Sequence, residues 1–169
     1  MEISKASLSD FDFIFSEIEK NFILDERRDY EYALALFKAG KYEIYTFTSE
    51  EKNLGFITLW QLGDFTFAEH FVIYEQYRNS GYGREALLEL ETMFPKIVLE
   101  TEEPIEIIQK RRLSFYKRSG FFQNEFPYLQ PSYRKNGNEI PLIIMSYPTL
   151  LDNFNEVVEK IHREVYSKQ

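Results

Sequence analysis

Residues 69–87 read EHFVIYEQYRNSGYGREAL, and this stretch decides the fold of the chain. An apolar strand, 70–74, runs into a polar turn that carries Gly81 and Gly83, and a helix follows directly. Because glycine has no Cβ, the backbone at these two positions can approach an anion closely and adopt unusual φ values. A glycine-bearing loop between a strand and a helix presents free backbone N–H groups and a helix N-terminus, an arrangement that binds phosphate. The stretch therefore predicts a phosphate site.

Three segments that end at this loop have the pattern of β-strands. Residues 42–48 are aromatic and β-branched, and the segments 54–62 and 65–74 follow after short polar turns. Strands joined by such turns are typical of an antiparallel meander. After the loop, a helix over 83–94 leads to the apolar strand 97–99. A strand, a helix and a strand of this length indicate a right-handed crossover, so the last two strands are predicted to be parallel.

The remaining segments complete an α/β (α+β) pattern. In chain order they are an edge strand over 2–6, helices over 7–22 and 25–38, a helix from Pro104 to Ser119, an irregular strand over 121–133 and a final strand over 141–147. We expect a mixed, mostly antiparallel sheet of about seven strands with helices on both faces.

Residues 148–169 are predicted to form a C-terminal helical extension of a domain that spans residues 1–147. Apolar side chains recur in it at helical spacing, namely Leu150, Phe154, Val157, Val158, Ile161 and Val165. This helix docks either on its own domain or on another copy of the chain. Both a monomer and a homodimer are consistent with that pattern.

The composition limits the classes of function. The chain has 169 residues with 20 basic and 28 acidic side chains, and its formal charge of −8 argues against binding nucleic acid and favours a cationic partner such as an amine. It has no cysteine, and its two histidines lack ligand-like spacing, so no disulfide and no catalytic metal are expected. No apolar run approaches the ~20 residues of a membrane span, so we expect a cytoplasmic protein that does not bind membranes.

The loop Arg78-Asn79-Ser80-Gly81-Tyr82-Gly83 matches the pattern R/Q-x-x-G-x-G/A, and the chain closely resembles the GNAT superfamily of N-acetyltransferases, in particular its compact bacterial members. Three further features carry the resemblance. The loop follows three antiparallel strands, residues 111–121 contain an aromatic-Tyr pair and end in Gly-Phe, and 128–131 with 141–145 resemble the closing strands. The resemblance covers residues 2–147.

The resemblance implies that the loop holds the pyrophosphate of acetyl-CoA, the acetyl donor. The cofactor would contact the end of the third strand and the loop, through Phe71, Val72, Ile73, Arg78, Asn79, Ser80, Gly81, Tyr82, Gly83 and Arg84. Backbone amides at a β-bulge expected near Val72 would polarise the thioester carbonyl. The chain departs from the family at Gln109, where many members have an asparagine for the pantetheine arm, and at Arg112, where a small residue is frequent.

The implied reaction is acetyl transfer to a primary amine of a small molecule or a peptide. By resemblance, Tyr116 donates a proton to the departing thiolate. A lysine-like amine has a pKa of about 10, so it must lose a proton before it attacks. We favour Glu69 as the base, because it lies on the third strand beside the cofactor, where family members often use a glutamate. His70 and a water relay are the alternatives.

Strict alternation along the third strand separates the two candidate bases. It places Phe67, Glu69, Phe71 and Ile73 on one face, and His70 and Val72 on the other. Only one of Glu69 and His70 is then expected to enter the site.

A cluster of four carboxylates after the strand 97–99, made of Glu100, Glu102, Glu103 and Glu106, either attracts a cationic amine or simply suits a helix N-terminus.

Two other functions are consistent with parts of the pattern. Gly81-x-Gly83-x-x-Ala86 also fits a dinucleotide fingerprint of an oxidoreductase, but several polar residues separate it from the strand end, and it does not open a leading βαβ unit. A GNAT-like domain that binds acyl-CoA or a protein partner without turnover is the second alternative. No Walker A sequence is present, so a P-loop nucleotidase is excluded.

Overall fold

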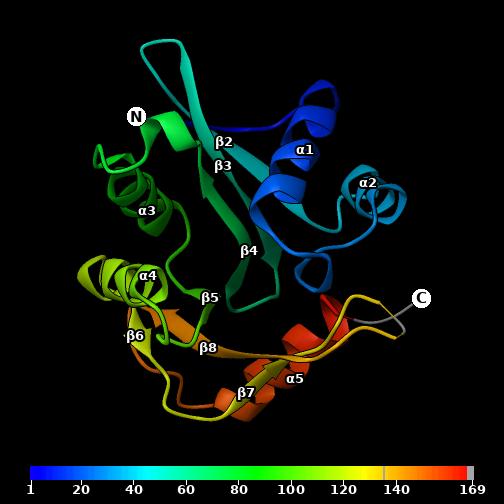
Figure 1. Cartoon of the computed structure of the whole chain (residues 1–169), viewed down its shortest axis with the longest axis vertical. Coiled ribbons are helices and arrows are strands. Elements are labelled where there is room, and N and C mark those ends of the chain that lie inside the picture. The colour runs from blue at the N-terminus through cyan, green and yellow to red at the C-terminus, as the bar shows by residue number, and fades with distance from the viewer. Residues whose placement is uncertain (135, 167–169) are drawn as a thin grey trace.

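Within residues 1–134 and 136–166, which the computed structural model describes, eight strands form one mixed sheet (Figure 1). Its order is β1-β2-β3-β4-β5-β8-β6, and β7 also pairs with β8. The strands are β1 (Glu2–Lys5), β2 (Glu43–Ser49), β3 (Lys52–Gln61), β4 (Thr66–Ile73), β5 (Ile97–Glu102), β6 (Phe122–Gln123), β7 (Tyr128–Gln130) and β8 (Ile140–Tyr147). The predicted fold class, a mixed and mostly antiparallel sheet, is confirmed.

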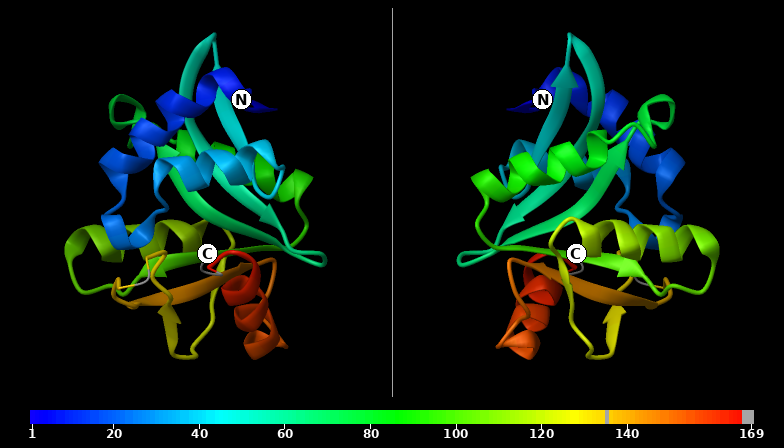
Figure 2. Two further views of the ribbon diagram at one scale, coloured as in Figure 1. Left: turned by 90° about the vertical axis from the view of Figure 1, so that its right-hand side faces the viewer. Right: turned by 90° about the vertical axis from the view of Figure 1, so that its left-hand side faces the viewer.

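Helices cover both faces of the sheet (Figure 2). On one face lie α1 (Phe11–Asn21), α2 (Tyr30–Lys38) and α5 (Phe154–Glu164), and on the other lie α3 (Tyr82–Met93) and α4 (Ile107–Arg118). Short 3₁₀ turns complete the elements, namely η1 (Leu8–Asp10), η2 (Leu24–Glu26) and η3 (Glu75–Tyr77). Two hydrophobic cores result, one on each side of the sheet.

The meander and the crossover agree with the sequence prediction. β2, β3 and β4 pair antiparallel, and β4 and β5 pair parallel. Every other strand pair in the described residues is antiparallel, so the sheet is not the doubly wound parallel sheet of a dinucleotide-binding dehydrogenase.

Three predicted boundaries were wrong. The second helix begins at Tyr30 rather than at residue 25, because η2 and an extended Arg27 precede it. The fourth helix begins at Ile107, after Pro104, because the Gln109 side chain accepts hydrogen bonds from the N–H groups of Ile105 and Glu106 and so caps the helix there. The segment 121–133 splits into β6 and β7, which pair with different parts of β8.

β4 contains a bulge at Glu69. Thr58 of β3 faces His70, but the next residue, Leu59, faces Ala68, so Glu69 is an extra residue in the ladder. The bulge expected near Val72 was therefore wrong by three positions. The predicted placement of Phe67, Phe71 and Ile73 on one face of β4 was also wrong, because the bulge interrupts the alternation. Phe67 and Val72 pack in one core, whereas Ala68, Phe71 and Ile73 pack in the other.

β4 and β5 pair over a short distance and then separate. Their parallel ladder joins only Thr66, Phe67 and Ala68 to Ile97, Val98 and Leu99. Beyond it β5 continues to pair with β8 as far as Glu102, while β4 continues with β3. From Glu69 onward one edge of β4 faces an opening between the strands.

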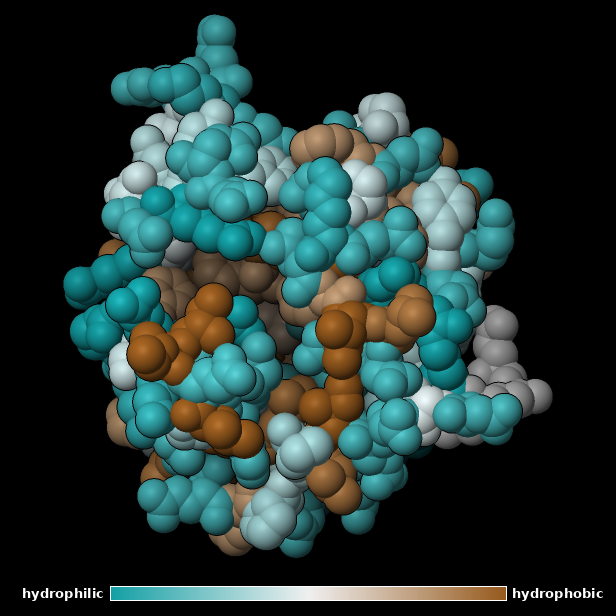
Figure 3. Space-filling view, in the orientation of Figure 1, coloured by the Kyte–Doolittle hydropathy of each residue, from teal (hydrophilic) through white to brown (hydrophobic). Residues whose placement is uncertain are grey.

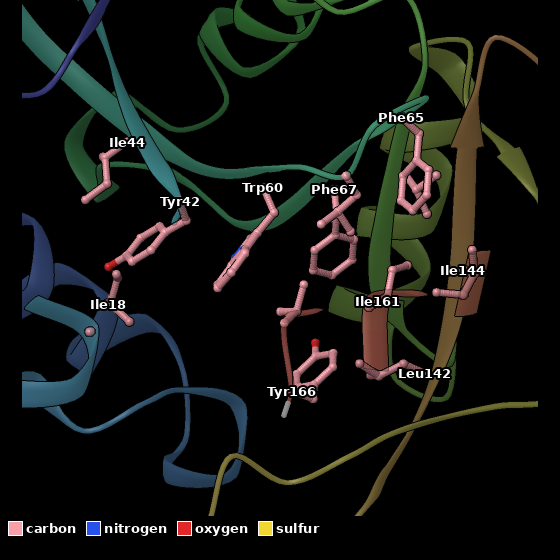
Figure 4. Close-up of a cluster of buried hydrophobic side chains, with 14 of the residues drawn as sticks. Ile18, Tyr42, Ile44, Trp60, Phe65, Phe67, Leu142, Ile144, Ile161 and Tyr166 are labelled. Atoms are coloured by element: carbon pink, nitrogen blue, oxygen red, sulfur yellow. The ribbon is translucent and has the colours of Figure 1, made fainter. Parts of the chain in front are cut away.

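The C-terminal helix α5 packs on its own chain. Val157, Ile161 and Val165 are buried in the same core as Phe67 and Ile144, and Figure 4 shows Ile161 and Tyr166 among those side chains. Residues 167–169 of the predicted extension lie outside the described residues. No described helix is both long enough and apolar enough to cross a membrane.

Candidate active site

A groove with a volume of about 890 Å³ opens where β4 and β5 separate. Figure 3 shows a hollow in this face of the molecule, with apolar residues in its depth, hydrophilic residues above it and exposed hydrophobic residues below it. Residues from β4, the following loop, β5, α4 and the β7 region line the groove. It brings together the predicted site residues Glu69, Phe71, Val72, Ile73, Arg78, Asn79, Gly81, Gly83, Arg84 and Tyr116. Ser80 and Tyr82 belong to the same loop but do not line it.

The loop has the backbone geometry of an anion site. Gly81 is the N-cap of α3 with φ of +88°, and Asn79 has φ of +62°. The carbonyl of Gly81 accepts from the N–H groups of Arg84 and Glu85 at 3.1 and 3.2 Å, which begins the helix. Within the described residues, no acceptor meets the N–H groups of 79–83. These free donors stand at the positive end of α3.

Gly83 and Arg78 hold this loop in place. A Cβ at Gly83 would lie 3.3 Å from the ring of Phe115, so the helix start packs closely on α4. The Arg78 guanidinium donates to the carbonyl of Ile73 at 2.9 Å and to the side chain of Asn21 at 2.7 Å. Arg78 thus ties the loop to β4 and to α1.

Glu69 lies in a buried ion pair. Its carboxylate pairs with Arg28, and it accepts hydrogen bonds from Trp60 Nε1 at 2.9 Å and Tyr133 Oη at 2.5 Å. The Glu69 side chain is only 2% exposed. Burial by itself would raise the pKa of Glu69, but the charge of Arg28 and the other donors lower that pKa to about 2. Such a carboxylate binds protons weakly near neutral pH.

His70 faces the same side of β4 as Glu69, and its Nδ1 lies 3.9 Å from a Glu69 oxygen. The expectation that only one of the two enters the site was wrong, because the bulge at Glu69 cancels the alternation there. His70 Nε2 lies 3.0 Å from the carbonyl of Glu26, so Nε2 carries the proton. Its Nδ1 lies 3.2 Å from the Thr58 hydroxyl. Both ring nitrogens are engaged, and burial lowers the pKa of His70.

Glu100 has the carboxyl group in the groove that is best suited to exchange a proton near neutral pH. It follows the β4–β5 ladder, is partly exposed into the groove, and accepts hydrogen bonds from the hydroxyls of Tyr128 and Tyr166. Burial raises the pKa of Glu100 to about 7, although the two hydroxyl donors act in the opposite direction. Sequence reasoning placed Glu100 in an acidic cluster and did not assign it as the base. The signal available was its position one residue after Leu99, where β5 leaves β4.

Tyr116 comes from α4 and reaches the groove from the other core. Its side chain packs between Phe115 and Phe121, with ring centroids 5.3 and 5.9 Å away. Burial raises the pKa of Tyr116 to about 12, so the hydroxyl stays protonated at neutral pH. The groove therefore contains a protonated hydroxyl and a carboxyl group with a pKa of about 7.

Comparisons with known proteins agree with this architecture. The Acetyltransferase (GNAT) family matches residues 9–121. A structure from Bacteroides thetaiotaomicron, assigned to the GNAT acetyltransferases, has 29% sequence identity and a TM-score of 0.93, with 100% of each chain covered. No curated protein sequence matches the chain.

More distant structures share the fold. Spermidine N-acetyltransferase from Vibrio cholerae has 14% identity and a TM-score of 0.65, covering 86% of this chain and 94% of its own. An aminoglycoside 6'-N-acetyltransferase solved with coenzyme A has 16% identity and a TM-score of 0.61, covering 86% and 96%. The family match over residues 9–121, together with the split sheet and the glycine loop at its groove, shows that this chain belongs to the GNAT family of acetyltransferases.

Proposed function

We propose that the chain is an N-acetyltransferase that transfers the acetyl group of acetyl-CoA to a primary amine. The observation that carries the proposal is one groove that joins three parts. These are a loop of free N–H groups at a helix N-terminus, the protonated hydroxyl of Tyr116 and the carboxyl group of Glu100.

The free N–H groups of 79–83 and the N-terminus of α3 bind the pyrophosphate of the cofactor, and Arg84 adds positive charge at the groove. The arm that carries the acetyl group follows the open edge of β4 past Phe71, Val72 and Ile73, since β5 has separated from that edge. The similar aminoglycoside acetyltransferase was solved with coenzyme A, which supports this placement. Gln109 caps α4 and is therefore not free to take the place of the asparagine frequent in the family.

Proton transfer runs through Glu100 rather than through Glu69. The ammonium form of the acceptor must lose a proton, and a base with a pKa near the working pH is the most effective. Glu100, with a pKa of about 7, meets that requirement, whereas Glu69, with a pKa of about 2 and an Arg28 partner, does not. The free amine then attacks the thioester carbon, the N–C bond forms and the C–S bond breaks. Tyr116 donates its proton to the departing thiolate, and the proton that the new amide nitrogen loses restores the Tyr116 hydroxyl.

The acceptor is a positively charged amine of a small molecule or peptide. Glu26 and Glu100 line the groove, where Glu102 is paired with Arg112, and the formal charge of the chain is −8. Negative side chains attract a cation to the part of the groove that they line. Glu69 adds little to this attraction, because Arg28 neutralises it.

The test is release of the coenzyme A thiol from acetyl-CoA with a panel of amines that includes polyamines, amino sugars, amino acids and peptide N-termini. Glu100→Gln is expected to lower kcat/KM by about 100-fold or more and to remove the acidic limb of its pH profile. Glu103→Gln is the matched control, because Glu103 is exposed and does not line the groove. Tight binding of acetyl-CoA with no thiol release for any amine would instead identify a binding module without turnover.

A further inference from the structure

The two residues that follow α5 contact Glu100, which lines the groove, and Arg28, the partner of Glu69. The hydroxyl of Tyr166 donates to Glu100 Oε2 at 2.6 Å, and the carbonyl of Val165 accepts from Arg28 Nη2 at 2.6 Å. Both contacts come from a segment beyond residues 9–121, the part of the chain that matches the family. Two neighbouring residues of this segment thus bind Glu100 and the Arg28 partner of Glu69.

The Tyr166 ring is fixed in place. Tyr166 is 4% exposed, and its ring centroid lies 4.9 Å from that of Tyr133, which itself donates to Glu69. His162, one turn earlier on α5, lies edge-on at 6.2 Å. Figure 4 shows Tyr166 in the same cluster of buried side chains as Trp60 and Leu142. The hydroxyl therefore points in one direction, toward the Glu100 carboxylate.

We propose that Tyr166 is a positioning residue of the acetyl transfer: its hydroxyl orients the carboxylate of Glu100 toward the acceptor amine and stabilises that carboxylate in its ionised form. The inference rests on the proposed function, in which Glu100 removes the proton of the amine. It assigns a catalytic task to the C-terminal segment, which the family match does not include.

The charges around Glu100 explain why such a donor matters. Glu69 of β4 and Glu26 of η2 both raise the pKa of Glu100, in addition to burial. Among the described residues, only Tyr128 of β7 and Tyr166, which follows α5, donate hydrogen bonds to it. An O–H donor favours the charged form of a carboxyl group.

The other titratable groups nearby contact neighbours of Glu100 rather than its carboxylate. Arg28 pairs with Glu69, and Glu102, on the same strand as Glu100, pairs with Arg112. Tyr133 and His162 pack on the Tyr166 ring rather than on the carboxylate. Because these groups do not change when the Tyr166 hydroxyl is removed, the loss of that one donor must raise the pKa of Glu100.

Tyr166→Phe tests this directly, because it removes the hydroxyl and keeps the ring. The Glu100 carboxyl is followed by carbon-13 NMR in a pH titration, with its signal assigned by its loss in Glu100→Gln. The titration midpoint is expected to move upward by about one pH unit, and the acidic limb of kcat/KM is expected to move with it. Tyr30→Phe is the matched control, because it removes a tyrosine-to-carboxylate hydrogen bond to Asp12 away from the groove and should shift neither curve.

A second substitution guards against loss of folding. Tyr166→3-fluorotyrosine keeps the shape and strengthens the donor, so it should move both curves to lower pH. An unchanged Glu100 titration in both Tyr166 variants would overturn the inference. The titration needs no turnover, so its outcome is separate from the proposed function. If the carboxyl titration moves while the acidic limb does not, Glu100 is not the base, and the catalytic part of the inference falls with that assignment.

Discussion

Arg28 and Glu69 form an ion pair inside the protein, and neither side chain exposes more than 3% of its surface. The Arg28 guanidinium also lies 5.0 Å from the Trp60 ring centroid and 4.5 Å from that of Tyr133. A buried charge that loses its partner is costly, because the remaining charge is not hydrated. The pair therefore acts mainly on stability.

Arg28→Met is expected to lower the free energy of unfolding by about 3–5 kcal/mol, because it leaves the Glu69 carboxylate buried and unpaired. Urea unfolding followed by circular dichroism measures this change. Lys5→Met serves as the control, since Lys5 and Glu43 form a pair at the surface with 62% of the lysine side chain exposed. That substitution should cost less than about 1 kcal/mol. Equal effects of the two substitutions would contradict a buried, charged Glu69.

Gly81→Ala is expected to raise the KM for acetyl-CoA roughly tenfold with a smaller change in kcat. At φ of +88° an alanine is strained, so the loop shifts and its free N–H groups no longer converge. Gly40→Ala carries the same kind of strain, at φ of +64° with open space around it, but lies outside the groove. It should lower stability by roughly 1 kcal/mol and leave the KM unchanged. A KM that responds equally to both substitutions would remove the loop from cofactor binding.

Tyr116→Phe is expected to lower kcat by about 100-fold or more while the KM for acetyl-CoA changes little. The hydroxyl, whose pKa burial raises to about 12, remains a proton donor throughout the working range. The ring is retained, so its packing with Phe115 and Phe121 is preserved. Steady-state rates between pH 6 and 9, measured by thiol release, check this prediction (roughly the range in which the amine and its base titrate). An unchanged kcat at every pH would rule out Tyr116 as the donor.

Glu100 should also change how stability depends on pH. Its pKa is raised from an ordinary value of 4.5 to about 7, so the folded protein binds the proton more tightly than the unfolded chain. Stability is therefore expected to fall as pH rises from 4.5 to 7, by up to roughly 3 kcal/mol. Glu69 has the opposite effect at lower pH. Because its pKa is lowered from 4.5 to about 2, its contribution to stability is lost as the pH falls from 4.5 to 2.

Urea unfolding of the unmodified protein and of Glu100→Gln across roughly pH 2 to 8 measures this linkage. The substitution should flatten the slope between pH 4.5 and 7 and leave the behaviour at lower pH, where Glu69 titrates, unchanged. The same slope in both proteins would mean that Glu100 keeps an ordinary pKa in the folded state.

Parts of the fold that depend on residues close together in the chain can be predicted from the sequence. The meander is visible in its strand and turn residues, and the loop at Gly81 and Gly83 follows from the absence of two Cβ atoms. The helix start at Ile107 was missed, although Gln109 stands three residues after the N-cap Glu106. A glutamine three residues after a glutamate is a weak capping signal, and its two hydrogen bonds to the N–H groups of Ile105 and Glu106 appear only in the folded chain.

The surroundings of the carboxylates do not follow from sequence, because their partners are distant in the chain. Glu100 meets Tyr128 and Tyr166, which are 28 and 66 positions away, and Glu69 meets Arg28 at a separation of 41. Which glutamate is buried with a cation and which faces the groove is decided by these long-range contacts. Strict alternation also predicted the wrong faces for side chains of β4. The bulge at Glu69 arises from pairing with β3, which is a long-range contact as well.

The extra residue at Glu69 is an insertion that β4 absorbs locally. Without it the ladder would pair without interruption, because Thr58 would still face His70 and Leu59 would still face Ala68. Phe67 and Ala68 would keep their separate cores, and only the buried carboxylate would be lost. Arg28 would then be buried without its partner, so a β4 that is one residue shorter is expected only together with an uncharged residue at position 28.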